Sequence, residues 1–350
     1  MENDLIKIIE ASINAPSGSN SQPWKFRIQK NIVDVIAEPE KDHPILNFRN
    51  RGTLIAHGAL IENIILSALE FGYEARVVLF PEKNITGRIT FSKRQKRGNV
   101  LFSAIRFRKT NRKPYLKTKL TQNEKEQLFK SENELDGGKI SFVEEEGVLS
   151  KIGKLVSFND LVMLENRQLH KLFFNEIVWT KSEQERKKAG LYLKTMELKF
   201  PQEKALKIFK YWPIMKWLNK LGLARKIASD NARIYSSASL SAIIMVENTD
   251  EMFLKAGRLL ERIWLKATNM GLSLQLITGV IFLKQRIDAG ETNIFSQEHI
   301  SLVRDSYNDL VNIFKVPRDK IIAVLFRIGK ADPPTDISSK RKPVIEISKE

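Results

Sequence analysis

Apolar positions along the chain follow two kinds of spacing. A spacing of three to four residues predicts helices over Asp4–Ile13, Gly58–Gly72 and Gly257–Gly271. Short apolar or alternating runs predict strands, among them residues 24–29 and 32–38. Further strands are expected at residues 74–80, 139–146, 238–247 and 320–330. Helices and strands are therefore mixed along the whole chain.

The helical segments that begin at Gly58 and Gly257 resemble each other. The same residue recurs at seven of their fifteen positions, and one recurring residue is a glutamate, Glu62 and Glu261. Each segment ends in a glycine, which suits the left-handed backbone beyond a helix end. We interpret the chain as two related halves, although two ordinary amphipathic helices of similar composition would give the same pattern.

The two predicted halves are unequal. The basic stretch at residues 92–99 lacks periodicity and predicts a junction, so the first half covers residues 1–98 and the second residues 99–350. The second half contains an insertion, residues 205–227, which mixes aromatic and basic residues and in which Pro213 interrupts the helical pattern. Such a segment can pack on the core, cover a site as a lid, or lie on a membrane surface. The last twenty residues are expected to form an extended arm.

Composition narrows the class of protein. The chain has 350 residues, 42% of them hydrophobic, which is enough for a sizeable core. The sequence has no apolar run of the ~18 residues that a membrane span needs. Its acidic, amphipathic start does not resemble a signal peptide. There is no cysteine, and the four histidines show no metal-ligand spacing. We therefore expect a cytoplasmic protein without an integral membrane segment, a metal site or thiol chemistry.

The formal net charge of +17 indicates an affinity for anions. The excess is spread over most of the chain, and no nucleic-acid-binding motif accompanies it. We interpret most of it as solvated surface and expect no nucleic-acid partner. A protein that binds polyanions without a cofactor is the alternative.

The stretch "RFRKTNRKPY", Arg106–Tyr115, concentrates basic side chains at one helix end. Arg108 and Arg112 are four residues apart, so a helix would place them on one face, with Thr110 near them if the end unwinds. Two guanidinium groups and a hydroxyl can clamp a phosphate. Neither the P-loop nor the Rossmann glycine motif occurs, so side chains would have to hold any phosphate. A solvated basic surface is the alternative.

The stretch "APSGSNSQPW", Ala15–Trp24, places small turn-forming residues between a helix and a tryptophan. Backbone N–H groups left bare in such a turn suit a planar, acceptor-rich ligand, and Trp24 would fix the turn to the core. An ordinary loop would have the same composition.

Together, "APSGSNSQPW", "RKTNR", the paired helices and the tail "SSKRKP" resemble the motifs of the FMN-dependent nitroreductase family. More narrowly, the chain resembles the group in which two nitroreductase-like domains are fused. The resemblance implies an α+β, nitroreductase-like fold whose halves form an intramolecular pseudo-dimer, with helices packed around β-sheets. Because the polar turn occurs only in the first half and "RKTNR" only in the second, it implies one FMN site between the halves.

The resemblance also assigns residues to the flavin. Arg108 and Arg341 would hold the phosphate, Thr110 the ribityl chain, and Arg112 and Asn231 the pyrimidine side. Backbone N–H groups near Thr278 and Gly279 would approach flavin N5. The full predicted set is Pro16, Ser17, Ser19, Asn20, Arg108, Lys109, Thr110, Arg112, Asn231, Thr278, Gly279 and Arg341. No protein side chain is expected to be catalytic, because the cofactor carries the chemistry.

The activity implied by the resemblance is hydride transfer through flavin N5 to an electron-poor acceptor, such as a nitro compound or a quinone. NAD(P)H is the donor usual in the family, the substrate would be a small molecule, and the protein would be a monomer with an internal pseudo-dimer or a homodimer. The chain departs from the family pattern at Thr278, Ser339 and Ile234. Residues 205–227 fall where a lid is expected, and a closed lid would exclude a nicotinamide. A flavin-storage protein without turnover is therefore a second interpretation, and an oxidase or dehydrogenase of a biosynthetic intermediate is a third.

Overall fold

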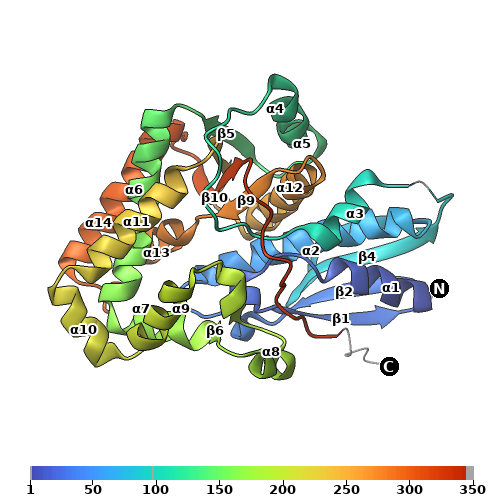
Figure 1. The fold of residues 1–350 in the computed structure, drawn as a ribbon. Helices are drawn as coiled ribbons and strands as arrows, with labels where there is room; N and C mark the ends of the chain where they lie inside the picture. Colours follow the sequence, from blue (N-terminus) through green and yellow to red (C-terminus); the bar gives the residue numbers. More distant parts are fainter. Residues whose placement is uncertain (1, 97, 344–350) are drawn as a thin grey trace.

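Two antiparallel four-stranded sheets organise the computed structural model, which describes residues 2–96 and 98–343 (Figure 1). The first sheet has the order β1 (Trp24–Gln29), β2 (Ile32–Ala37), β4 (Ile85–Lys93) and β3 (Tyr73–Glu82). The second has the order β5 (Lys139–Val143), β8 (Leu240–Val246), β10 (Ile321–Gly329) and β9 (Ser273–Leu276). The predicted α+β class is confirmed.

Two helices of equal length cross at the centre of the molecule. Helices α2 (Arg51–Glu70) and α12 (Asp250–Asn269) contain 20 residues each, and their bounds differ by the same shift that relates Gly58 to Gly257. A Cβ atom on Gly58 would lie 1.9 Å from the carbonyl oxygen of Leu254. One on Gly257 would lie 2.1 Å from the carbonyl oxygen of Ile55. The repeated glycines therefore let the two backbones touch.

Both halves contribute to one hydrophobic core. Val35 and Ile64 of the first half belong to the same buried cluster as Ile244 and Phe326 of the second. The predicted junction near residue 98 lies between β4 and α3 (Val100–Phe107), outside this core. Contrary to the expectation from the sequence, the stretch Phe48–Glu70 has the length and apolar composition of a membrane span, but 83% of the apolar 18-residue window within it is buried inside the protein. It is the central core helix.

Of the remaining helices, α1 packs against α2 beside the first sheet, and most of the others lie on the side of the second sheet. Figure 1 shows α6, α11 and α14 side by side at the left of the molecule. The bounds are α1 (Glu2–Ser12), α4 (Gln122–Phe129), α5 (Ser131–Glu134), α6 (Glu146–Glu165), α7 (Arg167–Glu176), α8 (Lys181–Lys187), α9 (Phe200–Phe209), α10 (Trp212–Lys220), α11 (Leu223–Ser236), α13 (Gly279–Asp288) and α14 (Gln297–Phe314). Strands β6 (Ile177–Val178) and β7 (Leu191–Tyr192) form a short parallel pair.

Two local features differ from the sequence prediction. Strand β4 was not predicted, although it alternates apolar and polar residues after the turn at Asn84. Helix α3 ends at Phe107, so Arg108 and Arg112 do not share a helix face. The backbone leaves the helix there, and Thr110 forms a parallel bridge with Leu274 of the edge strand β9. The basic stretch therefore runs along a sheet edge.

Residues 330–343 return to the polar turn as an arm without helix or strand (Figure 1), and the rest of the predicted arm, residues 344–350, lies outside the described residues. The side chain of Asn20 donates a hydrogen bond to the carbonyl oxygen of Lys340, at 2.9 Å. The backbone N–H of Lys342 donates to the side-chain oxygen of Gln22, also at 2.9 Å. The arm is thus fastened to the polar turn.

Candidate functional site

A cavity of about 340 Å³ lies where the polar turn, the stretch after α3 and the C-terminal arm meet. It is lined by nine of the twelve predicted flavin residues: Pro16, Ser17, Ser19, Asn20, Arg108, Lys109, Thr110, Arg112 and Arg341. A second hollow of about 260 Å³ shares Pro16, Ser17, Thr110 and Arg112 with the first and adds Thr278. Residues far apart in the sequence are therefore brought to one continuous space.

Asn231 and Gly279 do not line either hollow. The amide of Asn231 on α11 donates to the carboxylate of Asp160, at 2.8 Å. A Cβ atom on Gly279 would lie 2.3 Å from the side-chain oxygen of Asn159, so α13 begins against α6. The assignment of both residues to the flavin stays a prediction.

The polar turn is held in an unusual backbone conformation. Ser19, Asn20 and Gln22 have positive φ angles of 45°, 56° and 54°. Non-glycine residues in this region cost on the order of 1 kcal/mol each and persist only where the surroundings fix them. The hydroxyl of Ser17 accepts a hydrogen bond from the N–H of Gln22 at 3.0 Å, and Trp24 is buried at the base of the turn. The turn is a fixed wall of the cavity.

Two arginines approach the same end of the cavity. Arg108 donates to the carbonyl oxygen of Asn14 at 2.6 Å, and Arg341 donates to that of Ala15 at 2.8 Å. The guanidinium of Arg108 also lies 4.5 Å from the centre of the Trp264 ring. Burial, together with the charge of Arg108, lowers the pKa of Arg341 to about 9. The positive charges of the two arginines therefore repel each other in a buried place. A bound anion would offset this repulsion.

The carboxylate of Glu261 compensates this charge only in part. Its Oε1 lies 3.4 Å from Nε of Arg108. Among the described residues, neither Glu261 oxygen nor Arg108 Nε has a hydrogen-bond partner. Burial raises the pKa of Glu261 to about 7, and the attraction of Arg108 offsets only part of that rise. This end of the cavity therefore keeps a positive field that suits a phosphate.

The raised pKa of Glu261 predicts a pH-dependent stability for the ligand-free protein. Between the ordinary glutamate pKa of 4.5 and the native value of about 7, the native state binds more protons than the unfolded state. The free energy of unfolding should therefore fall as the pH rises from 5 to 8, by on the order of 2 kcal/mol from this group. We expect Glu261→Gln to remove most of this fall in urea unfolding curves.

Glu251→Gln, on the exposed side of the same helix, is the matched control and should keep the wild-type dependence. An equal loss of stability between pH 5 and 8 in wild type and Glu261→Gln would contradict the assignment.

The other end of the basic stretch is covered by residues 191–197. The N–H of Arg112 donates to the carboxylate of Glu197 at 2.6 Å, and its guanidinium donates to the carbonyl oxygen of Thr195 at 3.0 Å. Burial lowers the pKa of Arg112, while Glu197 opposes that shift. Residues 205–227, expected as a lid, contribute none of the described lining residues of this cavity. Leu191, Thr195 and the arm take that place.

A further hollow of about 260 Å³ lies on the opposite side of the polar turn. It shares Gly18 and Phe282 with the second hollow, so the three spaces adjoin. Its wall includes Asp42 and Glu176, and burial raises the pKa of both carboxyls. Glu176 accepts a hydrogen bond from the hydroxyl of Ser19. The wall of this hollow also includes Lys41, His43 and Lys342, so it carries groups of both signs.

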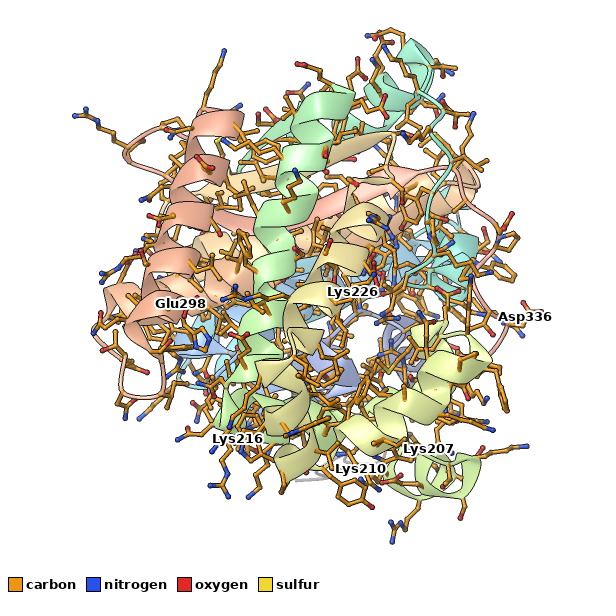
Figure 2. All side chains as sticks on the ribbon, turned by 60° about the vertical axis from the view of Figure 1, so that its left-hand side comes forward. Lys207, Lys210, Lys216, Lys226, Glu298 and Asp336 are labelled. Carbon is orange, nitrogen blue, oxygen red and sulfur yellow. The ribbon has the colours of Figure 1, made fainter. Side chains whose placement is uncertain are left out.

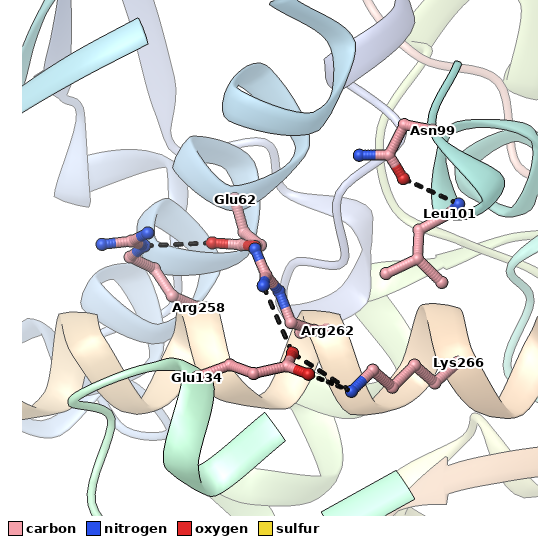
Figure 3. A network of polar contacts seen from close by, with 7 residues as sticks. All are labelled: Glu62, Asn99, Leu101, Glu134, Arg258, Arg262 and Lys266. Carbon is pink, nitrogen blue, oxygen red and sulfur yellow. Dashed lines mark hydrogen bonds and ion pairs between the residues drawn. The ribbon is translucent and has the colours of Figure 1, made fainter. Parts of the chain in front are cut away.

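The repeat places a second glutamate, Glu62, at the position related to Glu261. Figure 3 shows that Glu62 is enclosed by two arginines of α12. Arg258 Nε lies 3.1 Å from one oxygen of Glu62, and Arg262 Nε lies 2.7 Å from the other. Glu134 joins Arg262 to Lys266 at the surface. This position is filled by a closed ion network.

The corresponding position around Glu261 is not filled in the same way. By the shift that relates the helices, the counterparts of Arg258 and Arg262 in α2 are Ala59 and Asn63, which are smaller and uncharged. Arg108 and Arg341 approach Glu261 instead, and both line the cavity. Only one of the two related positions adjoins the cavity built from the predicted flavin residues.

No family model matches the chain. A curated relative, the Uncharacterized protein MT1398 of Mycobacterium tuberculosis (strain CDC 1551 / Oshkosh), is 20% identical over 349 residues. The match covers 95% of this chain and 47% of the relative, so the chain spans about half the length of the curated relative it matches.

Solved structures of nitroreductase-family proteins are similar to this chain. A nitroreductase with bound FMN from Bacteroides fragilis NCTC 9343 is 12% identical with a TM-score of 0.37, covering 72% of this chain and 100% of that one. An FMN-dependent nitroreductase from Clostridium difficile R20291 is 13% identical with a TM-score of 0.39, covering 73% and 100%.

An oxidized iodotyrosine deiodinase bound to FMN and 3-iodo-L-tyrosine is 12% identical with a TM-score of 0.37, covering 71% and 100%. These matches name the group of proteins that the sequence motifs resemble. The likeness is distant, so the function is inferred from the residues of the site.

Proposed function

We propose that this chain binds FMN in the cavity between its two halves and acts as an FMN-dependent oxidoreductase. One observation carries the proposal: the polar turn, the stretch Arg108–Arg112 and Arg341 line one cavity with incompletely compensated positive charge. FMN pairs a phosphate with a planar ring, and the joined hollows offer a matching pair of environments.

The chemistry of the two hollows fits the two ends of FMN. The larger one has Arg108, Lys109 and Arg341 in its wall, and these would hold the phosphate. The smaller one is lined by Ile55, Leu260, Trp264 and other apolar residues, against which a planar ring would lie. Among the described residues, Asn20 Oδ1 and Arg108 Nε are buried without a hydrogen-bond partner. A bound ligand would supply one.

The residues of the chain would bind and orient the group that reacts. FMN, when bound, supplies hydride transfer chemistry. Arg112 belongs to the wall that the two hollows share, where its positive charge favours negative charge on a bound ligand. The rigid turn at Ser17 fixes one face of the site. We assign no catalytic side chain of the protein.

The substrate, a small electron-poor acceptor such as a nitro compound or a quinone, would enter through the adjoining hollow beside Asp42 and Glu176. NAD(P)H is the proposed donor. We propose that the protein is cytoplasmic and that its two halves form an internal pseudo-dimer. The protein would be a monomer or a homodimer.

Flavin storage is a second candidate, and the position of the C-terminal arm favours it. Pro334, Thr335 and residues 337–341 line the cavity, and Lys109 donates to the carbonyl oxygens of Thr335 and Asp336 at 3.2 and 3.0 Å. An arm held in this way restricts access to a bound flavin. Anaerobic reduction separates the candidates: NADPH reduces the flavin of an oxidoreductase with this donor, whereas a storage protein responds only to dithionite.

We expect Arg341→Ala to raise the Kd for FMN by about 10- to 100-fold, because it removes a charge-assisted contact to the phosphate. The free energy of unfolding of the ligand-free protein should change by less than about 1 kcal/mol, since the exchange removes the hydrogen bond to Ala15 together with the repulsion between Arg341 and Arg108. Flavin fluorescence titration measures the Kd. Arg304→Ala, at an exposed position on α14, is the control and should bind FMN like wild type. An unchanged Kd in Arg341→Ala would argue against the proposed phosphate position.

A further inference from the structure

Residues 199–227 carry apolar side chains on two opposite sides. On the inner side, Leu206, Phe209 and Met215 pack with a core cluster formed by α6, α7 and α11. On the outer side, six large apolar residues are between 39% and 69% exposed: Phe200, Ile208, Tyr211, Ile214, Trp217 and Leu221. Packing within the chain therefore accounts for the apolar residues of the inner side but not for those of the outer side.

The outer residues lie on or directly next to two consecutive short helices, α9 and α10. Ile214 and Trp217 are exposed residues of α10, and Leu221 follows Trp217 by four residues as the C-cap of that helix. Ile208 lies near the end of α9, and Tyr211 follows three residues later as the N-cap of α10. We call these exposed residues, with the lysines between them, the outer face of 199–227. A group of exposed apolar side chains of this kind indicates a binding region.

The charge of this segment is almost entirely positive. Residues 199–227 include eight basic residues and a single acidic one, Glu203. That carboxylate is neutralised by Lys194, at 2.8 Å. Figure 2 shows Lys207, Lys210 and Lys216 along the lower edge of the molecule, and all three are exposed. Two exposed rings have a lysine beside them: Lys204 Nζ lies 4.4 Å from the centre of the Phe200 ring, and Lys210 Nζ lies 5.0 Å from that of Tyr211.

We propose that the outer face of 199–227 docks the protein peripherally on an anionic membrane surface. Trp217 and the neighbouring apolar side chains would enter the headgroup boundary, while the lysines contact lipid phosphates. Lysine stems can cover apolar surface and keep their charge at the polar layer. A second copy of the chain is a poor occupant, because two such basic faces would repel each other. This docking is independent of the flavin site, since no residue of the outer face lines the described cavity.

The test is co-sedimentation of the full chain with extruded vesicles of phosphatidylcholine alone or mixed two to one with phosphatidylglycerol. We expect binding to the mixed vesicles only. The triple variant Lys207→Gln, Lys210→Gln and Lys216→Gln should weaken the partition coefficient on the order of 100-fold. A second variant, Trp217→Ser with Leu221→Ser, should weaken it about tenfold or more while preserving the fold, because both side chains are exposed.

The matched control exchanges three exposed lysines of the first sheet, Lys25→Gln, Lys83→Gln and Lys93→Gln, which changes the net charge equally. Its partition coefficient should stay within about threefold of wild type, because these lysines lie outside the docking face. Equal weakening in both triple variants would overturn the assignment and attribute binding to the overall charge of +17. Failure of the wild type to sediment with mixed vesicles would also overturn it. The proposal would also be overturned if analytical ultracentrifugation showed that the wild type self-associates and that the serine variant does not.

Discussion

Replacing Glu62 by alanine is expected to lower the free energy of unfolding by about 3 to 5 kcal/mol, the range for breaking a buried ion pair by removing one partner. The carboxylate is fully buried and is held by Arg258 and Arg262 at 3.1 and 2.7 Å (Figure 3). Its loss leaves two partly buried guanidinium groups without their shared partner at the contact between α2 and α12. Urea unfolding of the ligand-free protein measures the change.

Glu134→Ala is the matched control, because Glu134 also pairs with Arg262 but its side chain is 31% exposed. Removing this partly solvated carboxylate should lower the free energy of unfolding by less than about 1 kcal/mol. Equal costs for the two variants would show that burial at the helix crossing does not determine the strength of this network.

Gly257→Ala is expected to destabilise the protein by about 3 kcal/mol, and Gly58→Ala by a similar amount. The added methyl group would meet a backbone carbonyl at 2.1 or 1.9 Å, so the central helices must move apart. Overpacking of this kind costs more than the roughly 1 kcal/mol that alanine gains over glycine within a helix. Thermal unfolding measures the loss. FMN affinity should fall as well, because the cavity takes residues from both halves.

Gly147→Ala is the control for helix propensity. Gly147 is an exposed helical glycine of α6, and a Cβ atom there would meet its nearest neighbour at an ordinary 3.6 Å. We expect its stability to be unchanged or slightly higher. A similar effect of all three exchanges would contradict the account of a backbone contact at the helix crossing.

The sequence was sufficient to predict features that depend on local pattern. Helical spacing predicted α2 and α12 and their glycine ends at Gly72 and Gly271, which have the positive φ angles expected there. Turn chemistry predicted the bend at residues 15–24. These features depend on the intrinsic preferences of a few neighbouring residues, which a single sequence carries.

Tertiary contacts account for what the sequence did not predict. Helix α3 ends at Phe107, and the following residues pair with Leu274, which lies far along the chain. Glu261 was noted only as a repeated residue, although its burial beside Arg108 shapes the charge of the cavity. The contacts of Glu197 and Thr195 with Arg112 also join distant segments. The spacing of residues along a single sequence does not show which distant segments come into contact.

The related positions Glu62 and Glu261 have different surroundings. Glu62 of α2 is held by Arg258 and Arg262 of α12. These ion pairs stabilise the contact between the two helices. Around Glu261 the corresponding residues are small, and Arg108 and Arg341 adjoin a cavity instead. One chain is therefore expected to bind one flavin, in contrast to a symmetric pair of sites.

The central claim is most directly tested by the visible absorption spectrum of the purified chain after incubation with FMN and removal of free ligand. The account predicts the two absorption bands of an oxidised flavin, at a stoichiometry of one FMN per chain. A colourless protein after this treatment would contradict the flavin site and leave a polyanion-binding protein as the better interpretation.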